Sequence, residues 1–133
     1  MTKEEIFSHI ENFCQKNGLQ NDKLPDAKVK GNHFFKKGNL YWAWYGEAYE
    51  GKLRIDFVAC PKESVRKEKY ASIRKMLNNR DYDIVEMKAA LHVFFVHDIE
   101  LESVSTDFLD NAMRKYQKFV NQDFDEIKGL LEK

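Results

Sequence analysis

Hydrophobic and polar residues alternate from Leu40 to Cys60, which predicts a β-hairpin with one buried and one solvated face. With Glu50-Gly51 as a two-residue turn, Trp44 pairs with Phe57 and Trp42 with Ala59 on the buried face. A slip by one residue would place both tryptophans in water, so the pattern predicts this register as well as the buried face. The solvated face carries the following residues: Tyr41, Tyr45, Tyr49, Glu47, Arg54 and Asp56. In this register Glu47 forms a cross-strand ion pair with Arg54, and Tyr45 lies opposite Asp56.

Helical spacing of apolar residues predicts two helices in the first 80 positions. The first runs from about Thr2 to Asn17, because Thr2 and Glu5 have the spacing of a capping box and Gly18 is a typical stop. The second runs from about Lys62 to Asn78, since proline at position 61 suits the first turn of a helix.

A third helix is predicted after a cap at Ser105 or Thr106. Unbroken from Asp107 to Glu132 it would be about 39 Å long, which is comparable to the diameter of the domain. Either it breaks near positions 121–123, where Asp123 would begin a second capping box, or its end projects toward a partner. The sequence leaves both alternatives open.

The remaining apolar runs predict strands on both sides of the second helix. A strand at 33–36 joins the hairpin through a Gly38-Asn39 turn, which places Phe35 opposite Trp42. Two further runs cover 82–88 and 91–98, separated only by Ala89-Ala90. Either Ala89-Ala90 forms a hairpin turn between two strands, or the two runs belong to one bent strand. A further alternative is that the first run is partly helical. Residues 18–30 read as a loop.

The element order therefore predicts a single α+β domain over residues 1–133. Its antiparallel sheet has about five strands, in the order α-β-β-β-α-β-β-α, and its helices pack mainly on one face. A chain of this length buries roughly two thirds of its unfolded surface, so no disulfide or metal is needed for stability.

Composition excludes several classes of protein. Hydrophobic residues make up 43% and charged residues 33% of the chain, which is not the composition of a disordered protein. No apolar run approaches the about 20 residues of a membrane span, and the acidic N-terminus does not resemble an export signal. Cys14 and Cys60 have no metal-ligand spacing. We expect a cytoplasmic protein with two free thiols, no membrane contact and no metal.

No motif predicts catalysis or a cofactor. The six glycines never approach a phosphate-loop spacing, and no serine or cysteine lies in a nucleophile elbow. His92 and His97 are five residues apart on a predicted strand, an odd separation that sends them to opposite faces. They are therefore not expected to share a metal ion, and we expect no catalytic residue and no cofactor.

The charge distribution suggests two binding surfaces. Residues 62–80 contain seven basic and two acidic residues, a net charge of +5, while residues 98–133 contain nine acidic and five basic residues, a net charge of −4. A nucleic-acid site would use the basic helix, at Arg66, Lys67, Arg74 and Lys75. A protein partner would use the solvated hairpin face, at Tyr41, Tyr45, Tyr49 and Arg54. A net charge of zero favours the protein partner.

Two families share part of this arrangement. Glu47, Asp56 and the Glu86-Met87-Lys88 run loosely resemble the acidic cluster of PD-(D/E)xK nucleases, which would imply Mg²⁺ at Glu47 and Asp56. Here, however, Phe57 and Val58 follow Asp56 in place of the family's acid-x-lysine motif. The element order is similar to that of type III secretion chaperones and the related YbjN-like proteins. That resemblance implies a homodimer that binds other polypeptides without catalysis.

Overall fold

The computed structural model describes residues 1–18, 22–23, 33–37, 40–45, 52–62 and 65–132. For residues 22–23, 33–37, 40–45, 58 and 132 it describes the backbone alone. The helical elements are α1 (Lys3–Lys16), α2 (Lys67–Asn79), a 3-10 turn (Leu101–Ser103), α3 (Thr106–Lys118), a π-helical turn (Phe119–Asp123) and α4 (Phe124–Glu132). The strands are β1 (Asp22–Lys23), β2 (His33–Lys37), β3 (Leu40–Tyr45), β4 (Lys52–Pro61), β5 (Asp83–Glu86) and β6 (Ala90–Glu100).

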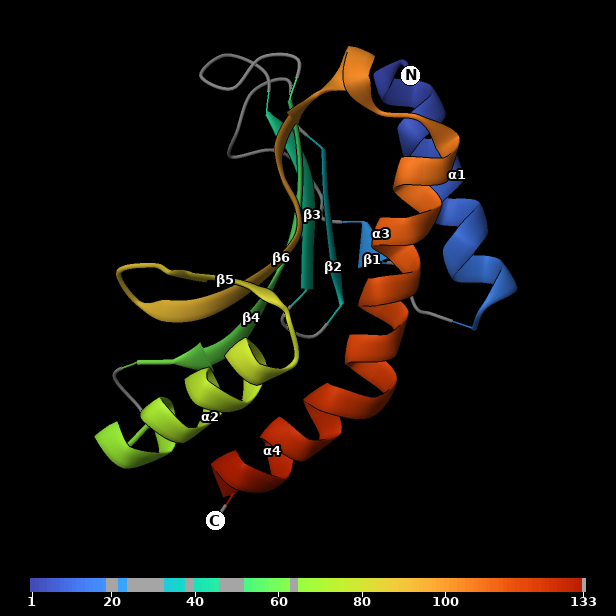
Figure 1. Cartoon of the computed structure of the whole chain (residues 1–133). Coiled ribbons are helices and arrows are strands. Elements are labelled where there is room, and N and C mark those ends of the chain that lie inside the picture. The colour runs from blue at the N-terminus through green and yellow to red at the C-terminus, as the bar shows by residue number, and fades with distance from the viewer. Residues whose placement is uncertain (19–21, 24–32, 38–39, 46–51, 63–64, 133) are drawn as a thin grey trace.

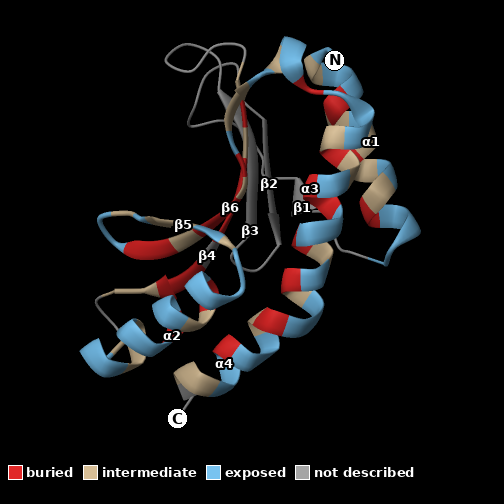
Figure 2. Ribbon diagram, in the orientation of Figure 1, coloured by how far each residue is buried: buried red, intermediate tan, exposed pale blue. Residues whose placement is uncertain are grey.

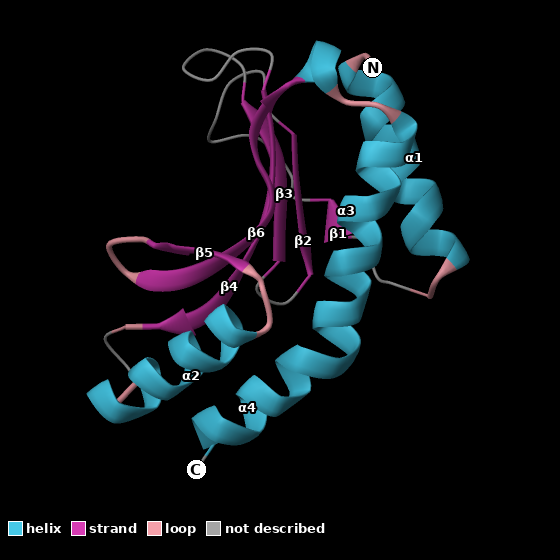
Figure 3. Ribbon diagram, viewed as in Figure 1, coloured by secondary structure: helices cyan, strands magenta, loops and turns pink. Residues whose placement is uncertain are grey.

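The strands form one antiparallel sheet in the order β1-β2-β3-β4-β6-β5 (Figure 3). The predicted α+β class is confirmed, and each of the five expected strands is present. The sixth strand, β1, has only two residues and lies in the segment that we expected to be a loop. Two residues carry too little periodicity to be recognised as a strand.

The helices cover one face of this sheet, as expected. Figure 1 shows α1 and α3 side by side along one side of the sheet, with α2 and α4 beside its lower end. Ile6, Ile73, Leu109 and Ile127, one from each α-helix, belong to the same buried cluster as Phe57 of β4. In Figure 2 the buried residues follow the surfaces where helices and strands meet. All the described helices therefore build a single core on the Phe57 face.

Helix α1 has the ends that the sequence predicts. The Thr2 hydroxyl accepts from the Glu5 amide at 3.1 Å, and the Glu5 carboxylate accepts from the Thr2 amide at 3.0 Å, which completes the capping box. Gly18 follows the helix with φ +66°, a left-handed conformation that glycine adopts without steric cost.

Substitution by alanine is expected to change the free energy of unfolding in opposite directions at Gly18 and Gly129. Gly18→Ala is expected to lower the free energy of unfolding by about 1 kcal/mol, because alanine is strained at positive φ. Gly129 lies exposed inside α4, where an added Cβ meets nothing within 4 Å. Gly129→Ala is expected to raise the free energy by about 0.5–1 kcal/mol through helix propensity. Urea unfolding of both variants checks the pair, and shifts of the same sign would contradict it.

The pairing of β3 with β4 differs from the predicted hairpin. Trp44 lies opposite Leu53 and Trp42 opposite Ile55, so each tryptophan is displaced by four residues from its expected partner on β4. Strand β3 ends at Tyr45 and β4 begins at Lys52, and the predicted Glu50-Gly51 turn lies outside the described residues. The shift is even, so both tryptophans keep the face that the pattern assigned to them. The β2–β3 register, with Phe35 opposite Trp42, is confirmed.

Helix α2 begins five residues later than predicted. Strand β4 continues through Pro61, which pairs with Ala90, so the proline ends a strand instead of opening a helix. At the other end of α2 the chain turns at Asp81, which has φ +60°. The Tyr82 amide donates to the Leu77 carbonyl and the Asp81 amide to the Asn78 carbonyl, both at 3.3 Å. These bonds form a Schellman motif with aspartate in the position that glycine usually takes.

Two features that the sequence left open are resolved. Strands β5 and β6 are antiparallel, and the Met87 amide donates to the Ala90 carbonyl at 2.9 Å, so this region is a hairpin. After α3, which Ser105 caps, the last helical stretch passes through a π-helical turn at Phe119–Asp123 and continues as α4. Ile127 of α4 is fully buried, so α4 packs against the core and does not project away from it.

Candidate functional site

The sheet face opposite Phe57 carries a cluster of charged and aromatic side chains, which we call the helix-free face. Its described members come from β4, β5 and β6: Arg54, Asp56, Asp83, His92, Phe94, His97 and Asp98. Arg54 and Asp56 alternate with Ile55 and Phe57 along β4, so they point away from the helices. The contacts described below join strand residues to one another.

Arg54 and Asp98 form the best defined pair on this face. The guanidinium donates from Nε and Nη2 to the two carboxylate oxygens at 2.9 and 2.8 Å. The Arg54 side chain is 16% exposed and that of Asp98 22%, so water screens the pair only in part. The bond from Arg54 holds the pKa of Asp98 below its ordinary value. This two-point contact fixes the orientation of the arginine.

Phe94 is the aromatic centre of the face. The Arg54 guanidinium lies over its ring, 5.3 Å from the centroid, and His97 meets the ring edge-to-face with centroids 4.3 Å apart. Phe94 is only 5% exposed, although it belongs to the face that the described helices do not cover. Charged and imidazole groups thus pack around a buried phenylalanine.

Asp56 and His92 form a second buried pair. His92 Nδ1 lies 2.7 Å from Asp56 Oδ2, and Asp56 is 7% exposed. His97 lies at the margin of the face, 3.7 Å from Asp83, where both side chains are about half exposed. The expectation that Asp56 would be solvated beside Tyr45 is therefore wrong. Register places Tyr41 opposite Asp56, and β6 supplies the histidine from the other side.

The two histidines share a face, which corrects the prediction that they would lie on opposite faces. Both His92 and His97 contact the Phe94 ring. The register of β4 against β6 shifts between Ile55 and Asp56 and again between Leu53 and Ile55. Such bulges interrupt the strict alternation of side chains, so an odd separation no longer implies opposite faces. Asp98, at φ +54°, lies in the second of these irregularities.

The predicted partner-binding residues are only partly described. Tyr41 and Tyr45 lie opposite Asp56 and Lys52, so register places both positions on the helix-free face, while Tyr49 lies outside the described residues. Arg54 is on the predicted face and pairs with Asp98, while the predicted ion pair with Glu47 falls outside the described residues. The role of these residues in binding a partner stays a prediction.

The predicted nucleic-acid residues lie together on α2 and its first cap. Arg66, Lys67, Arg74 and Lys75 are all exposed. Arg74 donates to Glu86 of β5 at 2.7 Å, and the described residues supply no ion pair to the other three. The structure thus brings this basic group together on one helix, on the far side of the sheet from Phe94.

The acidic residues of the nuclease resemblance are not assembled in the part of the chain that the structure describes. Glu47 lies outside that part, Asp56 is bonded to His92, and Glu86 contacts Arg74 and Lys62. Among the described residues, no group of three or more histidine, cysteine or acidic side chains is arranged to hold a metal ion.

Sequence reasoning missed a cluster around Asp123 in the π-helical turn. This carboxylate is 6% exposed and accepts from Arg80 at 2.5 Å and from the Tyr82 hydroxyl, while Arg80 also donates to Glu126 at 2.7 Å. Burial and Asp123 raise the pKa of Tyr82. The proximity of Asp123 and Glu126 was visible in the sequence, but their partners are more than 40 residues away. The cluster ties α4 to the end of α2.

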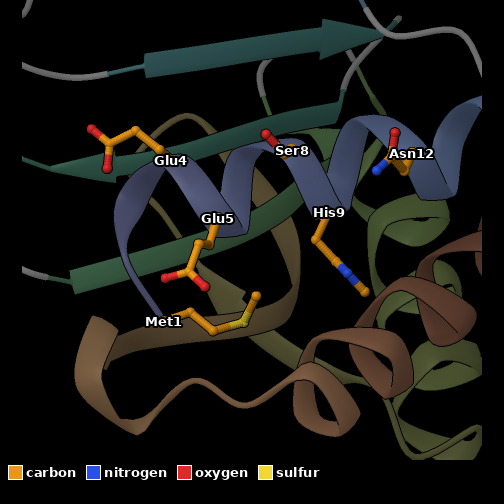
Figure 4. A pocket seen from close by; sticks show the side chains of 6 residues that line it. All are labelled: Met1, Glu4, Glu5, Ser8, His9 and Asn12. Atoms are coloured by element: carbon orange, nitrogen blue, oxygen red, sulfur yellow. The ribbon is translucent and has the colours of Figure 1, made fainter.

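A shallow polar hollow of about 420 Å³ lies beside the start of α1 (Figure 4). Its lining residues are Met1, Glu4, Glu5, Ser8, His9 and Asn12. Three of them already have partners: Glu5 closes the capping box, His9 Nε2 lies 2.6 Å from Asp110, and the Met1 ammonium donates to the carbonyls of Leu101 and Val104. The hollow therefore presents few polar groups to a ligand.

No protein-family model, curated protein or solved structure matches this chain. Among the residues that the structure describes, no helix is both long and apolar enough to cross a membrane. The geometry of the helix-free face and of α2 is thus the basis for an argument about function.

Proposed function

We propose that this chain is a small non-enzymatic protein-binding domain, and that the helix-free face is its binding surface. One observation carries the proposal: residues of all four α-helices join the core on the Phe57 face, so the opposite face has no described helical layer. Asp83 and His97 are exposed at its margin, and the positions of Tyr41 and Tyr45 share the face by register.

The chemistry of the face supports binding better than catalysis. Its buried and partly buried acids and bases are paired, Arg54 with Asp98 and Asp56 with His92. Because these pairs hold the side chains in place, their charged groups lie in fixed positions beside aromatic groups. Binding a partner therefore does not lose the conformational entropy that ordering long free side chains would cost. Tyrosine and arginine are the residue types that contribute most to protein interfaces.

Three further properties belong to the same proposal. A cytoplasmic location is supported by Cys14 and Cys60, which are both buried and form no disulfide with a described residue. A homodimer and a chaperone-like capture of other polypeptides are supported by the element order that this chain shares with type III secretion chaperones. Light scattering after size exclusion measures the oligomeric state directly, and a monomer at micromolar concentration would contradict the dimer.

Photo-crosslinking from position 45 tests the binding surface. With p-benzoylphenylalanine in place of Tyr45, we expect a discrete protein adduct in the native cells, because register places this position on the helix-free face. The matched control carries the same group in place of Arg114, which is exposed on α3 at the other side of the molecule. Both variants are first compared with the parent by thermal unfolding.

An adduct from position 45 alone that protease removes and nuclease leaves intact would support the proposal. Equal adducts from both positions, no adduct, or an adduct that nuclease removes would overturn it.

A further inference from the structure

The exposed side of α2 is a second surface, separate from the helix-free face. Lys67, Ala71 and Lys75 follow one another at intervals of four residues, so they form one row along the helix. All three are exposed, and Arg74 lies beside this row. We call Lys67, Ala71, Arg74 and Lys75 the basic row.

We propose that the basic row binds an acidic segment of a protein partner. Lys67 and Lys75 lie about 12 Å apart along the helix axis, and alanine between them leaves room for another chain to approach. Neither lysine makes an ion pair with any described residue, whereas the guanidinium of Arg74 is held by Glu86 at 2.7 Å. The row thus offers two ammonium groups that no described residue pairs, together with a guanidinium that Glu86 holds.

Charge complementarity favours an acidic polypeptide over nucleic acid. A protein that makes about 6–10 phosphate contacts on duplex DNA needs a comparable number of cationic groups to neutralise them. The basic row and Arg66 offer four cations, and Glu86 already neutralises part of the charge of one of them. Glu68 is also on this helix, at the cleft that α2 forms with Leu130 of α4. Carboxylates on a peptide, spaced several residues apart, match a row with so few positive charges.

This inference rests on the proposed function only in taking the partner to be a protein, and it concerns a different surface. The crosslinking experiment at position 45 and the experiment below therefore fail independently.

The experiment measures fluorescence anisotropy with defined probes. The acidic probe is a labelled 15-residue helical peptide of alanine, glutamine and glutamate, and the neutral probe has glutamine at every glutamate position. A 15-nucleotide thymidine strand and a 15-base-pair duplex complete the set. We expect the full chain to bind the acidic peptide at low salt, to ignore the neutral peptide, and to bind both nucleic acids more weakly.

Charge reversal of the row identifies the surface. Lys67→Glu with Lys75→Glu is expected to weaken binding of the acidic peptide by about tenfold, as the loss of two surface ion pairs and their replacement by repulsion implies. The control, Lys16→Glu with Lys115→Glu, makes the same change in net charge at exposed positions on α1 and α3. It should leave the affinity within about twofold of the parent.

Each other outcome overturns the proposal. Equal weakening in both variants would mean that only net charge matters. Tighter binding to either nucleic acid, lost on reversal of the row, would assign α2 to nucleic acid. Absence of binding to the acidic peptide at low salt would leave the basic row as a solvated helix surface.

Discussion

Replacing Phe119 by alanine is expected to lower the free energy of unfolding by about 3–5 kcal/mol. The side chain is fully buried in the π-helical turn. Its ring meets Phe57 at 5.0 Å, Tyr82 at 5.2 Å, Phe95 at 5.7 Å and Phe124 at 6.3 Å between centroids. Alanine would therefore leave a cavity where β4, β6, α4 and the start of β5 converge. Urea unfolding followed by circular dichroism measures the change.

The size of this effect depends on the space left behind, and Phe119→Leu is the matched control. Leucine fills most of the volume, so its cost should be no more than about half that of alanine. A loss below 1 kcal/mol for alanine would show that the aromatic cluster does not hold the C-terminal helix to the sheet.

Replacing Arg54 by alanine is expected to cost about 2–3 kcal/mol, the second largest effect. The change leaves the Asp98 carboxylate without its two donors and removes the group that covers Phe94. Because the side chain of Asp98 retains 22% exposure, water compensates part of the loss, and the cost stays below that of breaking a fully buried pair. Arg54→Lys keeps the charge but not the two-point bond, so an intermediate loss is expected.

The pH dependence of Asp98→Asn tests the same pair. Arg54 lowers the pKa of folded Asp98 below the value of 3.8 for an unperturbed aspartate. A lowered folded pKa contributes stability that is fully present above the unfolded value and is lost as the pH falls through the folded value. The parent should therefore exceed Asp98→Asn in stability at neutral pH, and the difference should shrink below about pH 4. A difference that grows on acidification would show that the pair does not stabilise the fold.

The expected losses of stability determine which variants can test binding at the helix-free face. From the sequence, Arg54 is a binding residue on the solvated hairpin face. In the structure it is a member of a partly buried ion pair, so loss of binding in Arg54→Ala would be confounded by loss of stability. Crosslinking from position 45 avoids this difficulty, since that position lies opposite Lys52 and its replacement removes neither member of the Arg54–Asp98 pair.

The hairpin shows what periodicity can predict. Alternation along residues 40–60 assigned Trp42 and Trp44 to one face, but it is equally compatible with every register that differs by an even number of residues. The register was taken from an expected Glu50-Gly51 turn, and the observed pairing of Trp44 with Leu53 differs by four positions. The face of the sheet on which a side chain lies depends on local alternation along its strand. The register between two strands depends instead on where the connection between them begins and ends.

The sequence predicted less of the candidate site than of the fold. Asp98 was counted only as one of several acids in the last segment, and no local pattern connects it to Arg54, 44 residues earlier. The bulges between β4 and β6 bring His92 and His97 to one face, and bulges leave no reliable mark in a single sequence. The Asp123 cluster likewise joins groups that meet only after α4 has packed beside α2.

The sequence by itself determined the α+β class, the capping box of α1, the glycine stop at position 18 and the buried side of β4. These features depend on contacts within a few residues, which the order of amino acids specifies directly. Only the tertiary structure decided the β3–β4 register, the pairing of Arg54 with Asp98, and the packing of α4 against α2. Each of these requires distant segments to meet, and packing of the whole core selects among pairings that are locally equivalent.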